Sequence, residues 1–205
     1  LQYLERAFVL VERLPEKDRP AFRMDLLQQR ARMHMSASEM RAAFVDYTAL
    51  AEEAHQLGDV DTQTSALLES AVPLLFVDYK RALSVNEQAR AAKARLQDWT
   101  ISALCDASHR FFKIYFEGWR KEEAEAMMVA LRKLREAEDA RVRSRAAWME
   151  SAAHCYVADY AAACEAAEES RRLARKTGVF FEYFVATMYL NWAAVHRGDL
   201  GMALR

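Results

Sequence analysis

A short turn-like motif recurs about every forty residues, and this periodicity restricts the chain to a small set of folds. Residues 76–82, 157–163 and 197–203 share one pattern, in which Asp is followed by an apolar residue and, three positions later, by Ala. Residues 34–43 and 116–124 carry looser versions. The anchor residues are 39, 42, 39 and 40 positions apart: Ala43, Ala82, Ala124, Ala163 and Ala203. Such a period is typical of solenoids built from stacked repeats.

Between these turns the apolar residues follow a helical spacing. Positions i, i+3, i+4, i+7 and i+10 of one stretch are apolar, which marks one face of an α-helix: Ala124, Met127, Met128, Leu131 and Leu134. The chain has only five Gly and three Pro, and neither Asn-Gly nor Asp-Gly occurs as a hairpin signal. We therefore expect an all-α fold in which each repeat is a pair of helices, each helix about 18–20 residues long, joined by short loops.

We expect residues 1–205 to form a single repeat domain, which the joints divide into repeats. A leading helix at 1–16 is followed by repeats at 17–58, 59–96, 97–138 and 139–178 and by a partial repeat at 179–205. Gly58 and Gly178 are expected to end helices, because Gly tolerates the left-handed conformation found there. Asp59 is expected to cap the next helix. Pro73 is expected to kink its helix or to split it near residues 71–72.

With its Gly-Asp-apolar-x-x-Ala turn, the chain resembles the tetratricopeptide repeat superfamily, most clearly over residues 189–203. The long repeat and the Leu-Gly-Asp joint at 57–59 are similar to one branch of it, the helical arrays of bacterial signal-transduction ATPases and of transcription activators such as the activator of the maltose regulon. The similarity covers nearly the whole chain. The chain departs from the ordinary repeat, which has about 34 residues and a Pro at the end of its second helix: its own repeat is longer and lacks that Pro. The peptide-clamp residues of the ordinary repeat are therefore not carried over to this chain.

This resemblance implies a right-handed superhelical solenoid of about five helix-turn-helix repeats. It also implies a regulatory array that senses a ligand or partner and controls ATP-driven self-assembly of a larger bacterial protein. The chain begins without Met and stops within a helical pattern at Arg205, so we expect a fragment of a longer protein. A stand-alone scaffold that recruits a partner protein is the alternative.

Charge and cysteine content exclude several classes of partner. With 29 Lys and Arg against 30 Asp and Glu, the net charge of −1 provides no basic field for nucleic acid. The longest apolar stretch, residues 179–195, carries Glu182 and Asn191 and is too short and polar to span a membrane. Three cysteines without a CxxC spacing, and no signal peptide, favour the reducing cytoplasm.

The sequence contains no recognisable catalytic motif. It lacks GxxxxGK[ST], HExxH, GxSxG and GxGxxG, so we expect no enzyme, no cofactor and no metal. Cys105 and His109 share a helix face, but no further ligands are evident, and a buried Cys beside an interfacial His is favoured over half a metal site. His154 and Cys155 are adjacent and cannot face each other on a helix. His154 and His196 occupy similar places in successive repeats, which favours an echo of the repeat over a pH or ligand role. An enzyme using Cys105, His109, Lys113 and His154 is the least favoured alternative.

Basic residues gather near the end of one predicted helix, at Arg171, Arg172, Arg175 and Lys176. Cations at this place complement the helix dipole, and that interpretation is favoured. A phosphate or nucleic acid site is the minor alternative, because acidic residues 165, 168 and 169 lie one turn away.

In solenoids of this kind the first helix of each repeat lines the concave face, which is where we expect a protein or peptide to bind. A small-molecule effector and self-association are the alternatives. The repeat register projects the following residues inward: Gln28, Arg32, Met35, Leu67, Ala71, Leu74, His109, Lys113, Phe116, Trp148, Ala152, Tyr156, Met188, Trp192 and His196. Aromatic, Met and Arg side chains are frequent in protein-binding hot spots. The alternative for Phe116, Trp148 and Trp192 is burial between helices.

Overall fold

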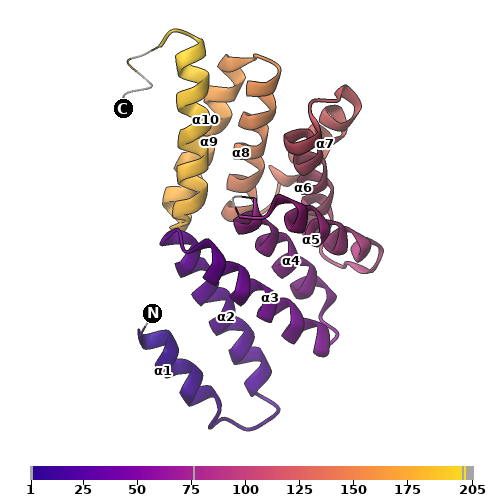
Figure 1. The fold of residues 1–205 in the computed structure, drawn as a ribbon, viewed down its shortest axis with the longest axis vertical. Helices are drawn as coiled ribbons and strands as arrows, with labels where there is room; N and C mark the ends of the chain where they lie inside the picture. Colours follow the sequence, from indigo (N-terminus) through magenta and orange to yellow (C-terminus); the bar gives the residue numbers. More distant parts are fainter. Residues whose placement is uncertain (1, 76, 200, 202–205) are drawn as a thin grey trace. The chain divides into compact units, whose positions relative to one another are not determined.

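The computed structural model describes residues 2–75, 77–199 and 201, and all the regular structure in this part of the chain is helical. Its elements are α1 (Gln2–Val11), α2 (Arg19–Ser36), α3 (Met40–Gln56), α4 (Val60–Leu74), α5 (Tyr79–Ala91), the short 3₁₀ helix η1 (Lys93–Arg95), α6 (Trp99–Glu117), α7 (Lys121–Leu134), α8 (Ala140–Tyr156), α9 (Tyr160–Thr177) and α10 (Phe180–His196). Consecutive helices pack in adjacent pairs, which confirms the all-helical, repeat-like fold class (Figure 1). Within the described residues, none of these helices is long and apolar enough to cross a bilayer.

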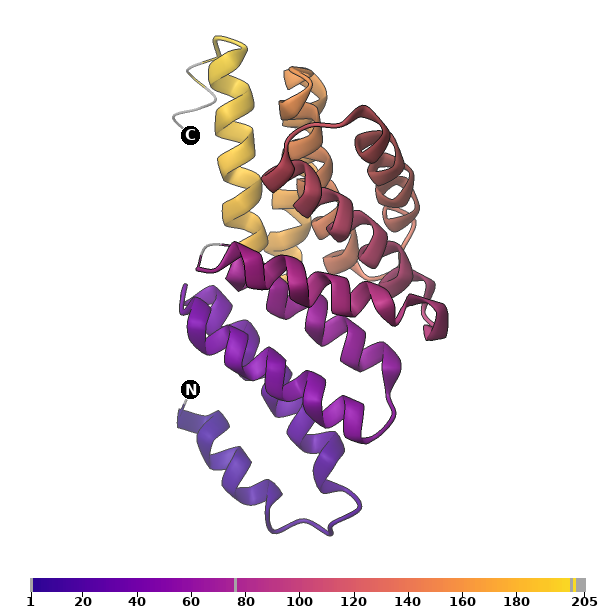
Figure 2. The same ribbon diagram turned by 45° about the vertical axis from the view of Figure 1, so that its right-hand side comes forward.

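Helix contacts divide the chain into two compact units, and the boundary between them falls within α6. The N-terminal unit extends to Cys105. In it α1 packs on α2, α2 on α3, α3 on α4 and α4 on α5 (Figure 2). The C-terminal unit begins at Asp106. There α7 packs on α8, α8 on α9 and α9 on α10, and α10 also contacts α8 (Figure 1).

The small anchor residues of the repeat lie inside these helix pairs. Ala43, Ala82, Ala124 and Ala163 each occupy the first turn or two of a second helix and are buried. A methyl side chain at such a contact lets the paired helices approach closely. The fifth anchor, Ala203, lies outside the described residues.

The joints repeat a left-handed residue at a fixed place. Six of the described residues have positive φ and are separated by multiples of 20 positions: Ser38 (60°), Gly58 (72°), Gly118 (97°), Ala158 (59°), Gly178 (71°) and Gly198 (77°). After all of these except Gly118, the next N–H donates to the carbonyl five residues earlier, in the pairs Glu39–His34, Asp59–Ala54, Asp159–His154, Val179–Ala174 and Asp199–Ala194. This backbone pattern closes the end of a helix. The predicted helix ends at Gly58 and Gly178 are confirmed.

Aspartates cap several of the following helices. Asp59 accepts a hydrogen bond from the Thr62 N–H at 3.0 Å, as predicted, and Asp159 accepts one from the Ala162 N–H at 3.3 Å. Each bond satisfies an amide that the first turn of a helix leaves unpaired. Pro20 lies in the first turn of α2, where its missing N–H removes no helical hydrogen bond.

Two expectations about helix length are corrected. Pro73 does not split its helix near residues 71–72, because α4 continues to Leu74 and Pro73 falls in its last turn. The chain leaves the helix there through a tighter bond from the Leu75 N–H to the Val72 carbonyl, at 3.2 Å. The predicted length of about 18–20 residues was too long for α4, α5 and α7, which have 15, 13 and 14 residues.

Candidate binding site

Aromatic side chains of the C-terminal unit contact one another in a continuous row near the joints that follow α6, α8 and α10. We call Trp119, Tyr156, Trp192, His196 and Tyr160 the aromatic row. Ring centroids are 6.2 Å apart from Trp119 to Tyr156 and 6.1 Å apart from Tyr156 to Trp192. Trp192 lies 6.2 Å from His196, which stacks on Tyr160 at 5.0 Å. The row therefore joins side chains from the turn after α6, the ends of α8 and α10, and the start of α9.

The row is partly open to solvent. Trp119 and Trp192 are each 40% exposed, and Met188, one turn before Trp192 on α10, is also exposed. Beneath Trp192 lies buried Tyr189, whose ring stacks on it at 6.1 Å and fixes its orientation. Single exposed apolar residues are ordinary, but a contiguous patch of large ones is a feature of binding surfaces.

A pocket of about 630 Å³ adjoins the row between α7, the end of α8 and the α6–α7 turn. Its lining is mostly apolar and consists of Trp119, Lys121, Ala124, Glu125, Met128, Val129, Arg132, Ala153, His154 and Val157. Trp119 belongs to the pocket and to the row, so the two form one surface. The volume lies within the range of ligand sites in proteins.

The charged groups around the pocket are mainly cationic. Lys121 is 3.8 Å from Glu125, with both side chains largely in solvent. Arg132 has no ion-pair partner among the described residues, and His154 Nδ1 lies 3.7 Å from Asp159. The open Arg132 guanidinium gives the pocket a preference for a ligand with a negative group.

Cys155 and His154 do not cooperate chemically. Burial, followed by the effect of Cys164, raises the pKa of the Cys155 thiol to about 11. Its Sγ lies 3.8 Å from the Tyr189 carbonyl, whereas His154 is directed to Asp159. A thiol that stays protonated at neutral pH is a poor nucleophile. The described residues also contain no cluster of three or more His, Cys, Asp or Glu side chains able to hold a metal ion.

Three residues predicted for the concave face, Tyr156, Trp192 and His196, are brought together in the row. Burial raises the pKa of Tyr156, with Tyr115 adding to the effect and a hydrogen bond with Tyr189 opposing it. Its phenol therefore stays neutral over the physiological range.

Apart from Met188, which lies one turn before Trp192, the other predicted residues lie elsewhere. Lys113 Nζ forms an ion pair with Glu123 at 3.0 Å. Phe116 is half-buried, and its ring centre lies 4.9 Å from that of Tyr115. Trp148 is only 4% exposed and meets Phe111 edge-on at 5.1 Å, so its side chain belongs to the core. Several further candidates are buried, namely Met35, Ala71, Leu74, His109 and Ala152, while Gln28, Arg32 and Leu67 are half-buried.

Sequence reasoning missed Trp119, Tyr160 and the pocket. Trp119 follows Gly118 in the turn between α6 and α7, outside the register from which the concave face was projected. A large aromatic residue in an otherwise polar turn, Glu-Gly-Trp-Arg-Lys, was the available signal. Met128 and Val129 were less detectable, because they continue the apolar pattern of α7.

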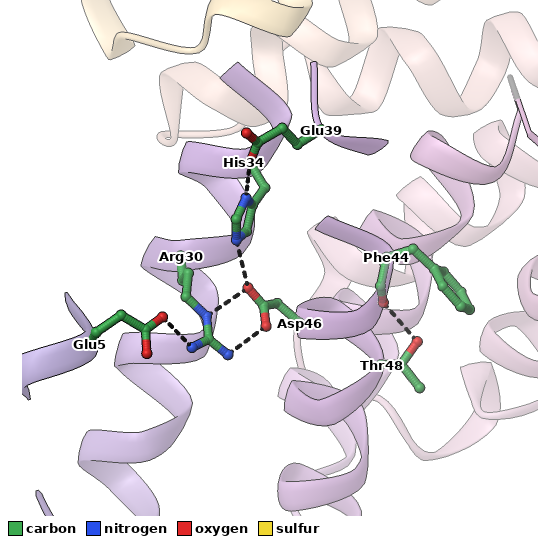
Figure 3. A network of polar contacts seen from close by, with 7 residues as sticks. All are labelled: Glu5, Arg30, His34, Glu39, Phe44, Asp46 and Thr48. Carbon is green, nitrogen blue, oxygen red and sulfur yellow. Dashed lines mark hydrogen bonds and ion pairs between the residues drawn. The ribbon is translucent and has the colours of Figure 1, made fainter. Parts of the chain in front are cut away.

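A polar network in the N-terminal unit has a different character (Figure 3). Arg30 donates two hydrogen bonds to Asp46, at 2.9 and 2.7 Å, and one to Glu5 at 3.0 Å. His34 contacts Glu39 and lies 3.6 Å from Asp46. The bond with Asp46 is the main cause that raises the pKa of Arg30, while burial opposes it. These groups are engaged with one another, so the network ties α1, α2 and α3 together.

A scan against protein-family models finds none that matches this chain, and a search of curated proteins finds no match. The pocket and the aromatic row are therefore the basis on which a function can be assigned.

Proposed function

We propose that the chain is a non-catalytic binding array, and that a segment of a partner protein binds across the pocket and the aromatic row. The observation that carries the proposal is their continuity through Trp119, which lines the pocket and contacts Tyr156. The pocket has room for more than one apolar side chain of such a segment, and the row extends the surface past the ends of α8 and α10. A surface longer than the pocket favours an extended peptide over a compact ligand.

The charges around the pocket describe the partner further. Arg132 has no ion-pair partner in the described part of the chain, and the only acidic side chain in the pocket lining, Glu125, is 3.8 Å from Lys121. An acidic residue near the anchoring apolar side chain would therefore meet a complementary charge. The half-exposed tryptophans supply apolar area with few rotatable bonds, as binding hot spots commonly do.

The experiment is a selection of random peptides on the purified chain, followed by affinity measurement with wild type and variants. Trp119→Ala should weaken the selected peptides at least about tenfold, because it removes the residue shared by pocket and row. Trp99→Ala is the matched control, since Trp99 is 50% exposed but lies outside both surfaces. Peptides that bind Trp119→Ala as tightly as wild type would show that the proposal is wrong.

A second candidate, a small-molecule effector, is favoured by the pocket's volume alone. Apolar carboxylic acids are suitable probes, because Arg132 and Lys121 lie in the lining. Binding that is lost in Val129→Asp but unchanged in Trp192→Ala would assign function to the pocket without the row. Peptide binding that is lost in both variants supports the partner-protein proposal.

We place this surface on a right-handed superhelical solenoid of about five repeats, acting as the regulatory arm of a larger bacterial protein. The recurring left-handed joints and buried anchors support the repeat, and the resemblance to tetratricopeptide arrays motivates the regulatory role. Reading the flanking coding sequence tests that role. A phosphate-loop ATPase or a helix-turn-helix domain there would support it, and a gene encoding repeats alone would favour the stand-alone scaffold.

A further inference from the structure

Two arginines on α9 converge on one tyrosine of α10. Arg171 and Arg175 are four residues apart, so they lie on the same face of α9. Each donates from Nη2 to the Tyr183 Oη at 2.9 Å. Their guanidinium carbons lie 5.1 and 5.0 Å from the centre of the Tyr183 ring. The phenolic oxygen is thus held between two forks of N–H donors.

The two guanidinium groups carry more charge than their partners balance. Within the described residues neither has an ion-pair partner, whereas the adjacent Arg172 is paired with Glu169 at 2.7 Å. Arg171 Nε is buried and has no hydrogen-bond partner in the part of the chain that the structure describes. Two positive charges therefore share a single neutral acceptor, which is an uncommon arrangement because arginine usually pairs with carboxylate or phosphate.

The pKa of Tyr183 reflects the positive charge around its phenolic oxygen. Hydrogen bonds from Arg171 and then Arg175 lower the pKa of Tyr183 to about 8. Negative charge is therefore favoured at the position of its oxygen. While the phenol is neutral, it accepts both arginine bonds and still has its own proton to donate.

We propose that Arg171, Arg175 and Tyr183 form a binding site for a phosphate-type dianion, either free phosphate or the phosphomonoester group of a small molecule. Each guanidinium offers parallel donors that match two oxygens of a tetrahedral anion, and the phenol offers a third contact. A dianion would balance both positive charges, whereas a carboxylate would balance one. The site uses no residue of the pocket or the aromatic row, so it stands apart from the proposed partner surface.

The helix dipole and a nucleic acid strand each fit this geometry less well. Basic residues near the end of α9 complement the helix dipole, but that effect does not require two side chains to converge on one oxygen. A nucleic acid would have to pass acidic residues 165, 168 and 169 of the same helix on a chain of net charge −1. A single phosphate group needs only the two guanidinium groups and the phenol, so it does not have to extend past those acidic residues.

The test titrates inorganic phosphate and phenyl phosphate into the chain at constant ionic strength, with chloride as the reference anion. Binding is measured by calorimetry, and Tyr183 ionisation by phenolate absorbance relative to Tyr183→Phe. We expect a dissociation constant on the order of 1 mM. Bound dianion should also raise the pKa of Tyr183 above about 8, because a phenolate beside it would be repelled.

The variants assign the effect to named residues. Arg171→Gln and the more exposed Arg175→Gln should each weaken binding about tenfold. Arg172→Gln is the control and should leave it unchanged, because Arg172 is already paired with Glu169. Circular dichroism checks that each variant is folded. If Arg171→Gln does not fold, the binding measured with Arg175→Gln decides the test on its own.

The outcomes separate the sources of the anion. Equal binding of both probes supports free phosphate, and tighter binding of phenyl phosphate supports a phosphomonoester. The proposal is overturned if both probes act only as chloride does, or if Arg175→Gln binds them like wild type. An oligonucleotide that binds much more tightly than phenyl phosphate would overturn the assignment to a single phosphate group.

Discussion

The first and fourth repeats, α2–α3 and α8–α9, share a backbone frame but hold their helices together differently. A shift of 120 residues aligns Ala43 with Ala163 and the left-handed Ser38 with Ala158. The same shift aligns His34 with His154, and each histidine contacts an acidic residue five positions later. The joints are thus nearly identical in the two repeats.

The interiors differ at the aligned positions 46 and 166. In the first repeat buried Asp46 is bound by Arg30, so a charged pair connects α2 with α3. In the fourth repeat the aligned residue is buried Ala166, and α8 meets α9 through small side chains. There the Ser151 hydroxyl donates to the Ala163 carbonyl at 2.8 Å, and the Ser170 hydroxyl to the Ser144 carbonyl at 2.9 Å.

The ends of the first helices differ as well, and this difference bears on function. Ser36 closes α2, whereas the aligned Tyr156 closes α8 and joins the aromatic row. One position therefore carries a small polar residue in one repeat and a binding candidate in another. The two repeats therefore share the backbone conformation of their joints, while the residue pairs between their helices and the residues at their helix ends differ.

Removing Arg30 should have the largest effect on stability. Arg30→Met leaves the Asp46 carboxylate, only 3% exposed, without its bidentate partner. We expect the free energy of unfolding to fall by about 3–5 kcal/mol, measured by urea denaturation. The double variant Arg30→Met/Asp46→Leu should recover most of this loss, because no buried charge remains. A loss below about 1 kcal/mol would class the pair with surface ion pairs.

The charged pair can also be transferred to the fourth repeat. Ala166→Asp buries a carboxylate between α8 and α9 and should reduce stability by about 2–3 kcal/mol. Adding Glu150→Arg places a guanidinium at the position aligned with Arg30, and we expect about 1 kcal/mol to be recovered. Glu150→Arg alone loses the ion pair with Arg135, so it serves as the control. If the double variant is no more stable than Ala166→Asp, the two repeats are not equivalent in their interiors.

Much of this frame could be predicted from spacing. The alanine anchors, the glycine joints and the Asp59 cap follow from local residue preferences that act within a few positions. Ser38 and Ala158 could not be recognised as left-handed, because L-residues rarely adopt that conformation and neither residue type signals it. The split expected near residues 71–72 is wrong because only Leu74 follows Pro73 in α4, so the helix ends there rather than continuing as a second piece.

The site was less predictable than the frame. The register placed Tyr156, Trp192 and His196 on one surface, but it placed Trp148 there too, and Phe111 covers Trp148. Helical period identifies a face without revealing which neighbouring side chain packs over it. The polar pair Arg30 and Asp46 is 16 residues apart across a joint, and only the packed structure shows that the two meet.

The α6–α7 pair provides an intermediate case, with ion pairs that are neither fully buried nor fully exposed. Lys113 and Arg110 both bind Glu123, and the hydrogen bond from Lys113 is the main cause that lowers the Glu123 pKa below 4.5. Glu123→Gln should reduce stability by about 1 kcal/mol at neutral pH. A lowered folded-state pKa stabilises the fold above pH 4.5, and that contribution is lost as the pH falls through the lowered value. The difference in unfolding free energy between wild type and variant should therefore vanish in acid. If that difference persists in acid, it comes from packing and not from the charge of Glu123.

The smallest effect tests what the two repeats share. Ser38 and Ala158 have φ of 60° and 59°, a conformation that is unfavourable for residues with a Cβ and readily adopted by Gly. Ser38→Gly and Ala158→Gly should each raise the free energy of unfolding by about 0.5–1 kcal/mol, because relief of strain exceeds the added entropy of the unfolded chain. Gly198 already occupies the aligned place in the following repeat, so Gly198→Ala should show the opposite sign. Thermal unfolding measures all three variants. Equal gains in stability from Ser38→Gly and Ala158→Gly would show that strain at the joint does not depend on the residues packed between the helices. A gain in only one repeat would show that the charged pair or the small residues between its helices change the strain at its joint.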